Sequence, residues 1–134
     1  IRWLAFNTIV GNADGHAKNL SLVRTDRDGL RLAPFYDLLS TAIYPRVATR
    51  VAMKIGKESD PGKVKATDWR ELAKAIGVGS FVENTVRELA EVMPERARET
   101  IAELEKQYGR FAFAESVVKV IRERARRISQ LLKG

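Results

Sequence analysis

The 134-residue sequence contains no cysteine and only one histidine, His16. Without cysteine, disulfide-stapled folds, zinc–thiolate sites and thiol nucleophiles are excluded, and a single histidine excludes a His-rich metal cluster. Charged residues interrupt every apolar stretch, so none approaches the roughly 20 residues that a membrane-spanning helix needs. We also expect no signal peptide, and a cytoplasmic protein with no membrane partner.

The composition is that of one folded domain. Hydrophobic residues make up 45% of the chain and charged residues 31%, which excludes wholesale disorder. Lysine and arginine number 24 against 17 aspartate and glutamate, a net charge of +7. Apolar residues are at helical spacing from the start of the chain, with no capping residue before them. We therefore expect a helix over residues 2–10 and a piece of a longer polypeptide.

Short strands are predicted in the first half of the chain. Residues 20–24 and 30–32 have strand character, and the Asp28-Gly29 step between them favours a tight reversal, so we expect a β-hairpin. Residues 50–56 are predicted as a further extended piece. The glycine- and proline-containing residues 58–65 are predicted to form a polar loop.

The character of the sequence changes to helical from residue 67. Asp68 with Glu71 predicts a capping box for a helix that stops at Gly77. Ser80 with Glu83 predicts another, for a helix whose apolar stripe continues to residue 108.

Two further features shape the expected helices. Pro94 predicts a break or kink near residue 93, because proline removes a helical hydrogen bond. The last helix begins near residue 114 and has a strongly basic exposed face, which is either a solvated surface or a contact for DNA phosphates or an acidic partner. The arginines expected on that face are Arg122, Arg124, Arg126 and Arg127.

The strongest candidate for chemistry is the loop at residues 11–19, between a helix and a strand. Asp14 and Asn19 have the Asp-x4-Asn spacing of a kinase catalytic loop, and Asp37 follows the hairpin where kinases place a metal-binding aspartate. Phosphoryl transfer needs such an inventory: a carboxylate near the attacking hydroxyl, and oxygen ligands for Mg²⁺. Asn-Ala-Asp-Gly is also ordinary turn chemistry, so a plain turn is the alternative for this loop.

Two motifs together resemble one family. Gly11-Asn-x-Asp-x-His-x-Lys-Asn19 and Pro34-x-Tyr-Asp-Leu-Leu-Ser-Thr41 are similar to the C-terminal lobe of HipA-like serine/threonine kinases, the toxins of bacterial toxin–antitoxin pairs. The resemblance implies a mainly α-helical, protein-kinase-like C-terminal lobe, a helical bundle with one small β-hairpin. Residues 1–66 would carry the catalytic loop, hairpin and metal loop, and residues 67–134 a helical subdomain.

The same resemblance implies roles for individual residues. Asp14 would be the catalytic base, Asn19 and Asp37 the Mg²⁺ ligands, and His16 a contact near the ATP phosphates. Lys18 can offset phosphate charge. Gly15 and Tyr36 border the same site by adjacency in the sequence.

The resemblance is incomplete in one respect. A kinase also needs a glycine-rich phosphate loop and a lysine that pairs with the α- and β-phosphates, and neither is present. The N-terminal ATP-binding lobe is therefore expected to be absent from this chain. We expect these 134 residues alone to be inactive, and a lobe cut from its partner to expose apolar surface and self-associate.

Partners follow from the resemblance as well. It implies a helix-turn-helix antitoxin, operator DNA, and a protein substrate, aminoacyl-tRNA synthetases being the target class of the family. Two alternatives stay open at this point: a small-molecule kinase of the aminoglycoside or lipid type, and a non-enzymatic basic helical module that binds DNA or protein.

Overall fold

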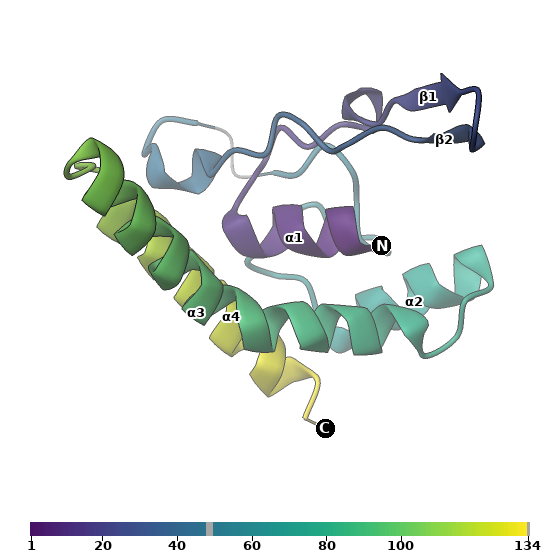
Figure 1. The fold of residues 1–134 in the computed structure, drawn as a ribbon. Coiled ribbons are helices and arrows are strands. Elements are labelled where there is room, and N and C mark those ends of the chain that lie inside the picture. The colour runs from purple at the N-terminus through teal and green to yellow at the C-terminus, as the bar shows by residue number, and fades with distance from the viewer. Residues whose placement is uncertain (48–49, 134) are drawn as a thin grey trace.

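The computed structural model describes residues 1–47 and 50–133. Four α-helices and one antiparallel pair of strands make up the regular structure of this part of the chain (Figure 1). None of the described helices has the length and apolar character needed to cross a bilayer. The elements in order are α1 (Arg2–Val10), the 3-10 turn η1 (Ala17–Asn19), β1 (Leu22–Thr25), β2 (Gly29–Leu32), the 3-10 turn η2 (Thr41–Ile43), α2 (Ala66–Ile76), α3 (Phe81–Tyr108) and α4 (Ala114–Leu131).

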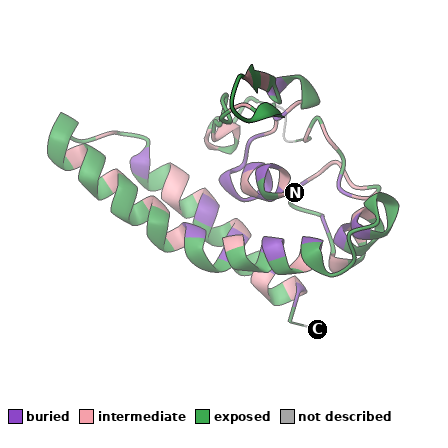
Figure 2. Ribbon diagram, turned by 45° about the vertical axis from the view of Figure 1, so that its right-hand side comes forward, coloured by how far each residue is buried: buried purple, intermediate pink, exposed green. Residues whose placement is uncertain are grey.

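The core lies where α1 meets the antiparallel pair of α3 and α4. The buried sides of these helices face one another, as the purple segments in Figure 2 show. Ile9, Val82 and Val86 are fully enclosed, and Ile121 and Ala125 from α4 pack into the same cluster. Apolar burial of this kind is the main favourable term in folding, so α1 is held firmly against the helical half of the molecule.

The β-hairpin is confirmed, with a one- or two-residue shift of its strands. Leu22 pairs with Leu32 and Thr25 with Gly29, so the reversal consists of residues 26–28, directly before the predicted glycine. The hairpin projects from the top of the molecule in Figure 1 and buries none of its residues. Its leucines are therefore not core residues.

For α2, the predicted C-terminal residue is confirmed, but the predicted N-terminal capping residue is not. Gly77 ends α2 in the left-handed conformation, at φ 71°, as expected. The capping prediction for Asp68 was wrong: α2 begins at Ala66, and the Asp68 carboxylate accepts the backbone N–H of Lys65 at 2.7 Å. Asp68 therefore caps from the third helical position, where its charge also suits the helix dipole.

The start of α3 shows the same pattern. The helix begins directly after Ser80 as predicted, but the Ser80 side chain makes no capping hydrogen bond. Glu83 is bonded instead to Arg70 of α2, with an Nε–Oε1 distance of 2.6 Å. The carboxylate joins two helices rather than closing a capping box.

Of the break or kink predicted near residue 93, the break is absent, because α3 continues through Pro94 as one helix. The helix does change direction near its middle in Figure 1. Met93 is buried and Ala97 is packed against the core, so both sides of the proline are fixed by tertiary contacts. These contacts offset the lost hydrogen bond, and the proline bends the helix rather than ending it.

The extended piece predicted for residues 50–56 was wrong, because no strand forms in this segment. The segment has only an isolated bridge between Ile55 and Glu58. Gly56, at φ 59°, turns the chain so closely against α2 that a Cβ there would be 2.8 Å from the Asp68 carbonyl oxygen. A tight turn at this point replaces the strand.

Candidate functional site

The loop that carries Asp14 leaves α1 through Gly11. This residue adopts the left-handed conformation, at φ 82°, and its N–H donates to the carbonyl oxygen of Asn7 at 3.1 Å. A Cβ at Gly11 would be 2.7 Å from the Ala42 Cβ and 3.0 Å from a methyl carbon of Val120. Both the backbone angle and the lack of space require glycine here.

Hydrogen bonds of buried side-chain amides fix the position of the Asp14 loop. Asn12 donates from Nδ2 to Oδ1 of Asn7 at 2.9 Å and to the backbone oxygen of Asp37 at 3.0 Å. Its Oδ1 accepts the backbone N–H of Asp14 at 3.0 Å, and Asn12 itself is only 2% exposed. One asparagine thus ties together α1, the loop and the segment of Asp37. Sequence reasoning missed these roles, although the buried Asn7 lies one turn before Gly11 and Asn12 lies inside the motif.

Asp14 lies at the surface and contacts His16. The His16 Nε2 is 3.0 Å from Oδ1 of Asp14, and the two side chains are 43% and 66% exposed. A carboxylate placed this way is open to a macromolecular hydroxyl, and the imidazole restrains its orientation. His16 was expected near ATP phosphates; its contact in the structure is with the candidate base.

Asn19 and Asp37, the two expected metal ligands, are brought together. Nδ2 of Asn19 donates to Oδ2 of Asp37 at 2.6 Å, and Oδ1 of Asn19 accepts the backbone N–H of His16 at 2.9 Å. Asp37 has φ 58°, the left-handed region that aspartate tolerates better than most residues. The bond spans 18 positions of sequence and the entire hairpin.

The donor set of this pair fits one kind of metal site. Mg²⁺ is usually held by one or two carboxylates together with water and substrate phosphates. Asn19 and Asp37 offer an amide oxygen and a carboxylate, and in the described ranges no three His, Cys, Asp or Glu residues are grouped to hold a metal. The pair therefore fits a magnesium ion shared with a nucleotide, and does not fit a cage made by protein side chains alone.

The remaining expected site residues have structural contacts. Gly15 is buried against α1, where a Cβ would be 3.2 Å from Cγ of Asn7. The Tyr36 hydroxyl donates to the backbone oxygen of Lys18 at 3.0 Å and lies 3.0 Å from Oγ of Ser21. Tyr36 thus links the Asp37 segment to the base of the hairpin, while the Lys18 side chain is exposed at the same edge.

Two hydroxyl residues that follow Asp37 add further hydrogen bonds to the end of α1 and to the Asp14 loop. Ser40 donates to the backbone oxygen of Val10 at 2.7 Å. Thr41 donates to the Gly11 oxygen at 3.0 Å and accepts the Ala13 N–H at 2.8 Å. Both residues belong to the motif at residues 34–41, and the sequence assigns neither a role. In the structure they join the segment of Asp37 to the catalytic loop.

The four arginines of the basic helix do not share one surface. The prediction that Arg124 is exposed was wrong: it is half-buried and donates from Nη1 to the backbone oxygen of Thr8 at 2.9 Å. Removal from water lowers the pKa of Arg124, and the charge of Asp60 partly opposes that shift. Arg126 and Arg127 are exposed as predicted.

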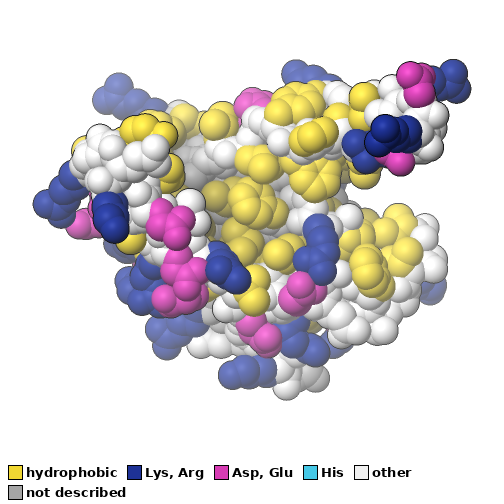
Figure 3. Space-filling model, viewed as in Figure 1, with side chains coloured by type: hydrophobic (Ala, Val, Ile, Leu, Met, Phe, Trp, Pro, Cys, Tyr) yellow, Lys and Arg dark blue, Asp and Glu magenta, His cyan; other side chains and the backbone are white. Residues whose placement is uncertain are grey.

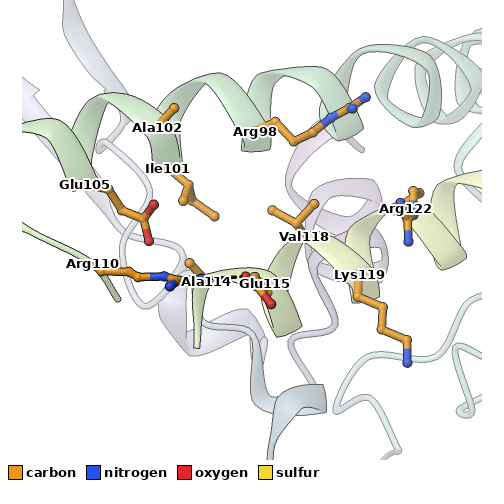
Figure 4. A pocket seen from close by; sticks show the side chains of 10 residues that line it. All are labelled: Arg98, Ile101, Ala102, Glu105, Arg110, Ala114, Glu115, Val118, Lys119 and Arg122. Carbon is orange, nitrogen blue, oxygen red and sulfur yellow. Dashed lines mark hydrogen bonds and ion pairs between the residues drawn. The ribbon is translucent and has the colours of Figure 1, made fainter. Parts of the chain in front are cut away.

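Arg122 lies at a pocket of about 390 Å³ between α3 and α4 (Figure 4). Ile101 and Val118 point toward each other across it, and Arg110 and Glu115 form an ion pair at 3.1 Å along its edge. No candidate catalytic residue lines this pocket.

Residues 1–125 match the model of the family described as the HipA-like C-terminal domain. The chain belongs to this family. The family predicted from the two motifs is thereby confirmed.

Three known proteins show how far the likeness extends. The chain is 40% identical over 97 residues to "Putative kinase Y4mE" of Sinorhizobium fredii, covering 66% of this chain and 23% of that protein. It is 32% identical over 103 residues to "Serine/threonine-protein kinase toxin HipA" of Shewanella oneidensis, covering 75% of this chain and 23% of the toxin. The fold matches a chain in the solved complex of Shewanella oneidensis HipA, HipB and operator DNA with a TM-score of 0.81, at 24% identity, over 99% of this chain and 32% of that one.

These matches support the coarse predictions of fold and family. A mainly helical domain with a two-stranded antiparallel sheet is confirmed, and its relatives are named kinases. The chain spans less than a quarter of the length of the curated relatives it matches. The names of these relatives therefore describe whole proteins of which this chain matches only one part.

Proposed function

We propose that this chain is the C-terminal lobe of an ATP-dependent serine/threonine protein kinase, and that it carries the catalytic and metal loops. The observation that carries the proposal is the contact between Asn19 and Asp37, which joins an amide at the end of the Asp14 loop to a carboxylate from the segment after the hairpin. Kinship with proteins named as kinases supports the same reading.

In the proposed reaction, the hydroxyl oxygen of a serine or threonine attacks the γ-phosphorus of ATP. The bond from phosphorus to the β,γ-bridging oxygen breaks, ADP leaves, and the hydroxyl proton passes to the Asp14 carboxylate. Asn19 and Asp37 would hold Mg²⁺, which neutralises charge on the phosphates. His16 orients Asp14, and Lys18 adds positive charge at the same edge.

The remaining catalytic parts would come from polypeptide outside these residues. No glycine-rich phosphate loop is present in the sequence, so the ATP-binding lobe is supplied elsewhere and the 134 residues alone are inactive. By likeness to the HipA–HipB–DNA complex, the full-length protein would bind a helix-turn-helix antitoxin and operator DNA, with Arg126 and Arg127 as candidate phosphate contacts. An aminoacyl-tRNA synthetase is the proposed class of protein substrate.

The test is a phosphorylation assay on the full-length protein with Mg²⁺ and ATP, using Asp14→Ala, Asp37→Ala and, as control, Asp26→Ala in the exposed hairpin turn. We expect phosphate on the protein itself or on a protein substrate with wild type and the control, and none with the other two variants. Equal activity of all four proteins would refute the proposal. Transfer to an aminoglycoside or lipid instead of a protein would favour the small-molecule kinase.

A further inference from the structure

The C-terminal end of α1 is held by contacts from three different parts of the chain. The last carbonyl groups of a helix have no partner within the helix and need one from elsewhere. The Asn7 oxygen accepts the N–H groups of Gly11 and Asn12, at 3.1 and 2.9 Å. The Val10 oxygen accepts Ser40 Oγ, and the Thr8 oxygen accepts the Arg124 side chain.

Arg124 reaches this end of α1 from a helix 116 residues further along the chain. Its Cζ lies 3.5 Å from where a Cβ on Gly11 would be, so the guanidinium covers the first residue of the catalytic loop. The same side chain lines a cavity of about 180 Å³ together with Gly11, Ala13 and Thr41. The positive charge of Arg124 also interacts favourably with the negative, C-terminal end of the α1 dipole.

The setting distinguishes Arg124 from the other cations of α4. Arg126 and Arg127 point to solvent, and Lys119 lies 4.0 Å from Glu123 on the surface. The Arg124 guanidinium is partly removed from water and donates a hydrogen bond to the backbone oxygen of Thr8 instead. A half-buried guanidinium is costly unless it is hydrogen-bonded, so this contact constrains both elements that make it.

We propose that Arg124 is a positioning residue that fixes the start of the catalytic loop, and with it Asp14, by holding the Thr8 carbonyl and packing on Gly11. This inference rests on the proposed kinase function. The loop leaves α1 at Gly11, and Asp14 follows three residues later. A shift of α1 or Gly11 therefore moves the carboxylate relative to the phosphate acceptor, while the Asn19–Asp37 pair is also restrained through Tyr36 and Asn12.

The experiment compares Arg124→Ala, Arg124→Lys and the control Arg96→Ala, at an exposed arginine of α3, in the full-length kinase. We expect Arg124→Ala to lower kcat by roughly 10- to 100-fold, the scale of an ångström-sized misplacement of a catalytic group, with the KM for ATP changed less than about threefold. Arg124→Lys keeps the charge and most of the stem, so its kcat should be intermediate. The control should match wild type.

Chemical rescue separates positioning from general loss of structure. Guanidinium chloride, well below denaturing concentration, should restore part of the kcat of Arg124→Ala by occupying the vacated space, and sodium chloride at equal ionic strength should not. The inference is overturned if Arg124→Ala keeps the kcat of the control, or if guanidinium restores nothing. If Arg124→Ala does not fold, an unchanged kcat in Arg124→Lys overturns it.

The outcomes also separate this inference from the proposed function. If wild type transfers no phosphate, or if Asp14→Ala retains activity, the kinase proposal itself fails. If Asp14→Ala is inactive while Arg124→Ala equals its control, only the positioning role of Arg124 fails.

Discussion

The side-chain amide of Asn19 donates to the carboxylate of Asp37 across 2.6 Å, which closes the loop that contains the entire hairpin. Neither residue belongs to the core cluster. Both are held by backbone-directed bonds, Asn19 by the His16 N–H and the Asp37 segment by Asn12. The pair is therefore preorganised by the fold, which lowers the cost of assembling a ligand site when a nucleotide binds.

Replacing Asn19 by alanine should weaken binding of Mg²⁺–ADP to the full-length protein by about 10- to 100-fold, because the proposed amide oxygen ligand and the hydrogen bond that orients Asp37 are both lost. Isothermal titration calorimetry measures the affinity. Asn84→Ala at an exposed position of α3 is the control for the same chemical change. Unchanged affinity of Asn19→Ala would remove this residue from the nucleotide site.

Replacing Asn12 by alanine should lower the free energy of unfolding by about 1–3 kcal/mol for each buried partner left without a hydrogen bond. The buried partner is the Asn7 side chain, whereas the Asp37 carbonyl and the Asp14 N–H are partly open to water and add less. Urea denaturation of this variant and of Asn84→Ala measures the difference. If both variants lose the same stability, the network contributes nothing beyond an ordinary surface asparagine.

Gly11→Ala and Gly77→Ala form a matched pair that separates backbone strain from steric overlap. Both glycines have left-handed angles, φ 82° and 71°, so alanine costs roughly 1–2 kcal/mol at each. Gly11 adds contacts at 2.7 and 3.0 Å, whereas a Cβ at Gly77 meets nothing within 4 Å. We expect Gly11→Ala to lose about 1–3 kcal/mol more than Gly77→Ala in thermal or urea unfolding. Equal losses of unfolding free energy in the two variants would show that the residues around Gly11 move aside to accommodate the Cβ without an energetic cost.

Glu58 should titrate below its ordinary pKa. Its carboxylate accepts the backbone N–H groups of Asp60 and Ser59, both at 2.8 Å. The bond from Asp60 is the largest cause of the lowered pKa, and burial and the nearby Asp60 charge partly oppose it. Because the pKa is lower in the folded state, the stabilisation is present above the unfolded pKa and is lost as the pH falls through the folded one. NMR titration of the side-chain carboxyl gives the midpoint, and a value above the ordinary one would contradict the prediction.

The hairpin is the most exposed apolar element, and we expect it to drive self-association of the 134 residues. Leu22, Leu30 and Leu32 share one face by the strand register and are 62%, 63% and 56% exposed. Figure 3 shows further hydrophobic side chains across the centre of one face of the molecule, over α1 and the segments above it. Sedimentation velocity should detect oligomers that the double variant Leu30→Ser with Leu32→Ser reduces, and that Arg31→Ser on the opposite hairpin face does not. A wild-type chain that stays monomeric at high concentration contradicts the expectation.

Local chemistry made several features predictable from the sequence. The helix over residues 2–10, the turn directly before Gly29 and the stop at Gly77 each depend on nearby residues whose backbone preferences are strong. The two motifs at residues 11–19 and 34–41 identified the family, because order and spacing are properties of the chain itself.

Tertiary contacts decided the rest. Pro94 lies inside a continuous α3 because packing on both sides outweighs its local cost, and Glu83 bonds to Arg70 rather than to its own helix start. Helical spacing placed Arg124 on a basic face, but it could not reveal that the Thr8 carbonyl lies within its reach. The sequence by itself determined which residues are available for chemistry, and only the folded chain decided which of them meet, since such contacts join positions separated by 18 to 116 residues.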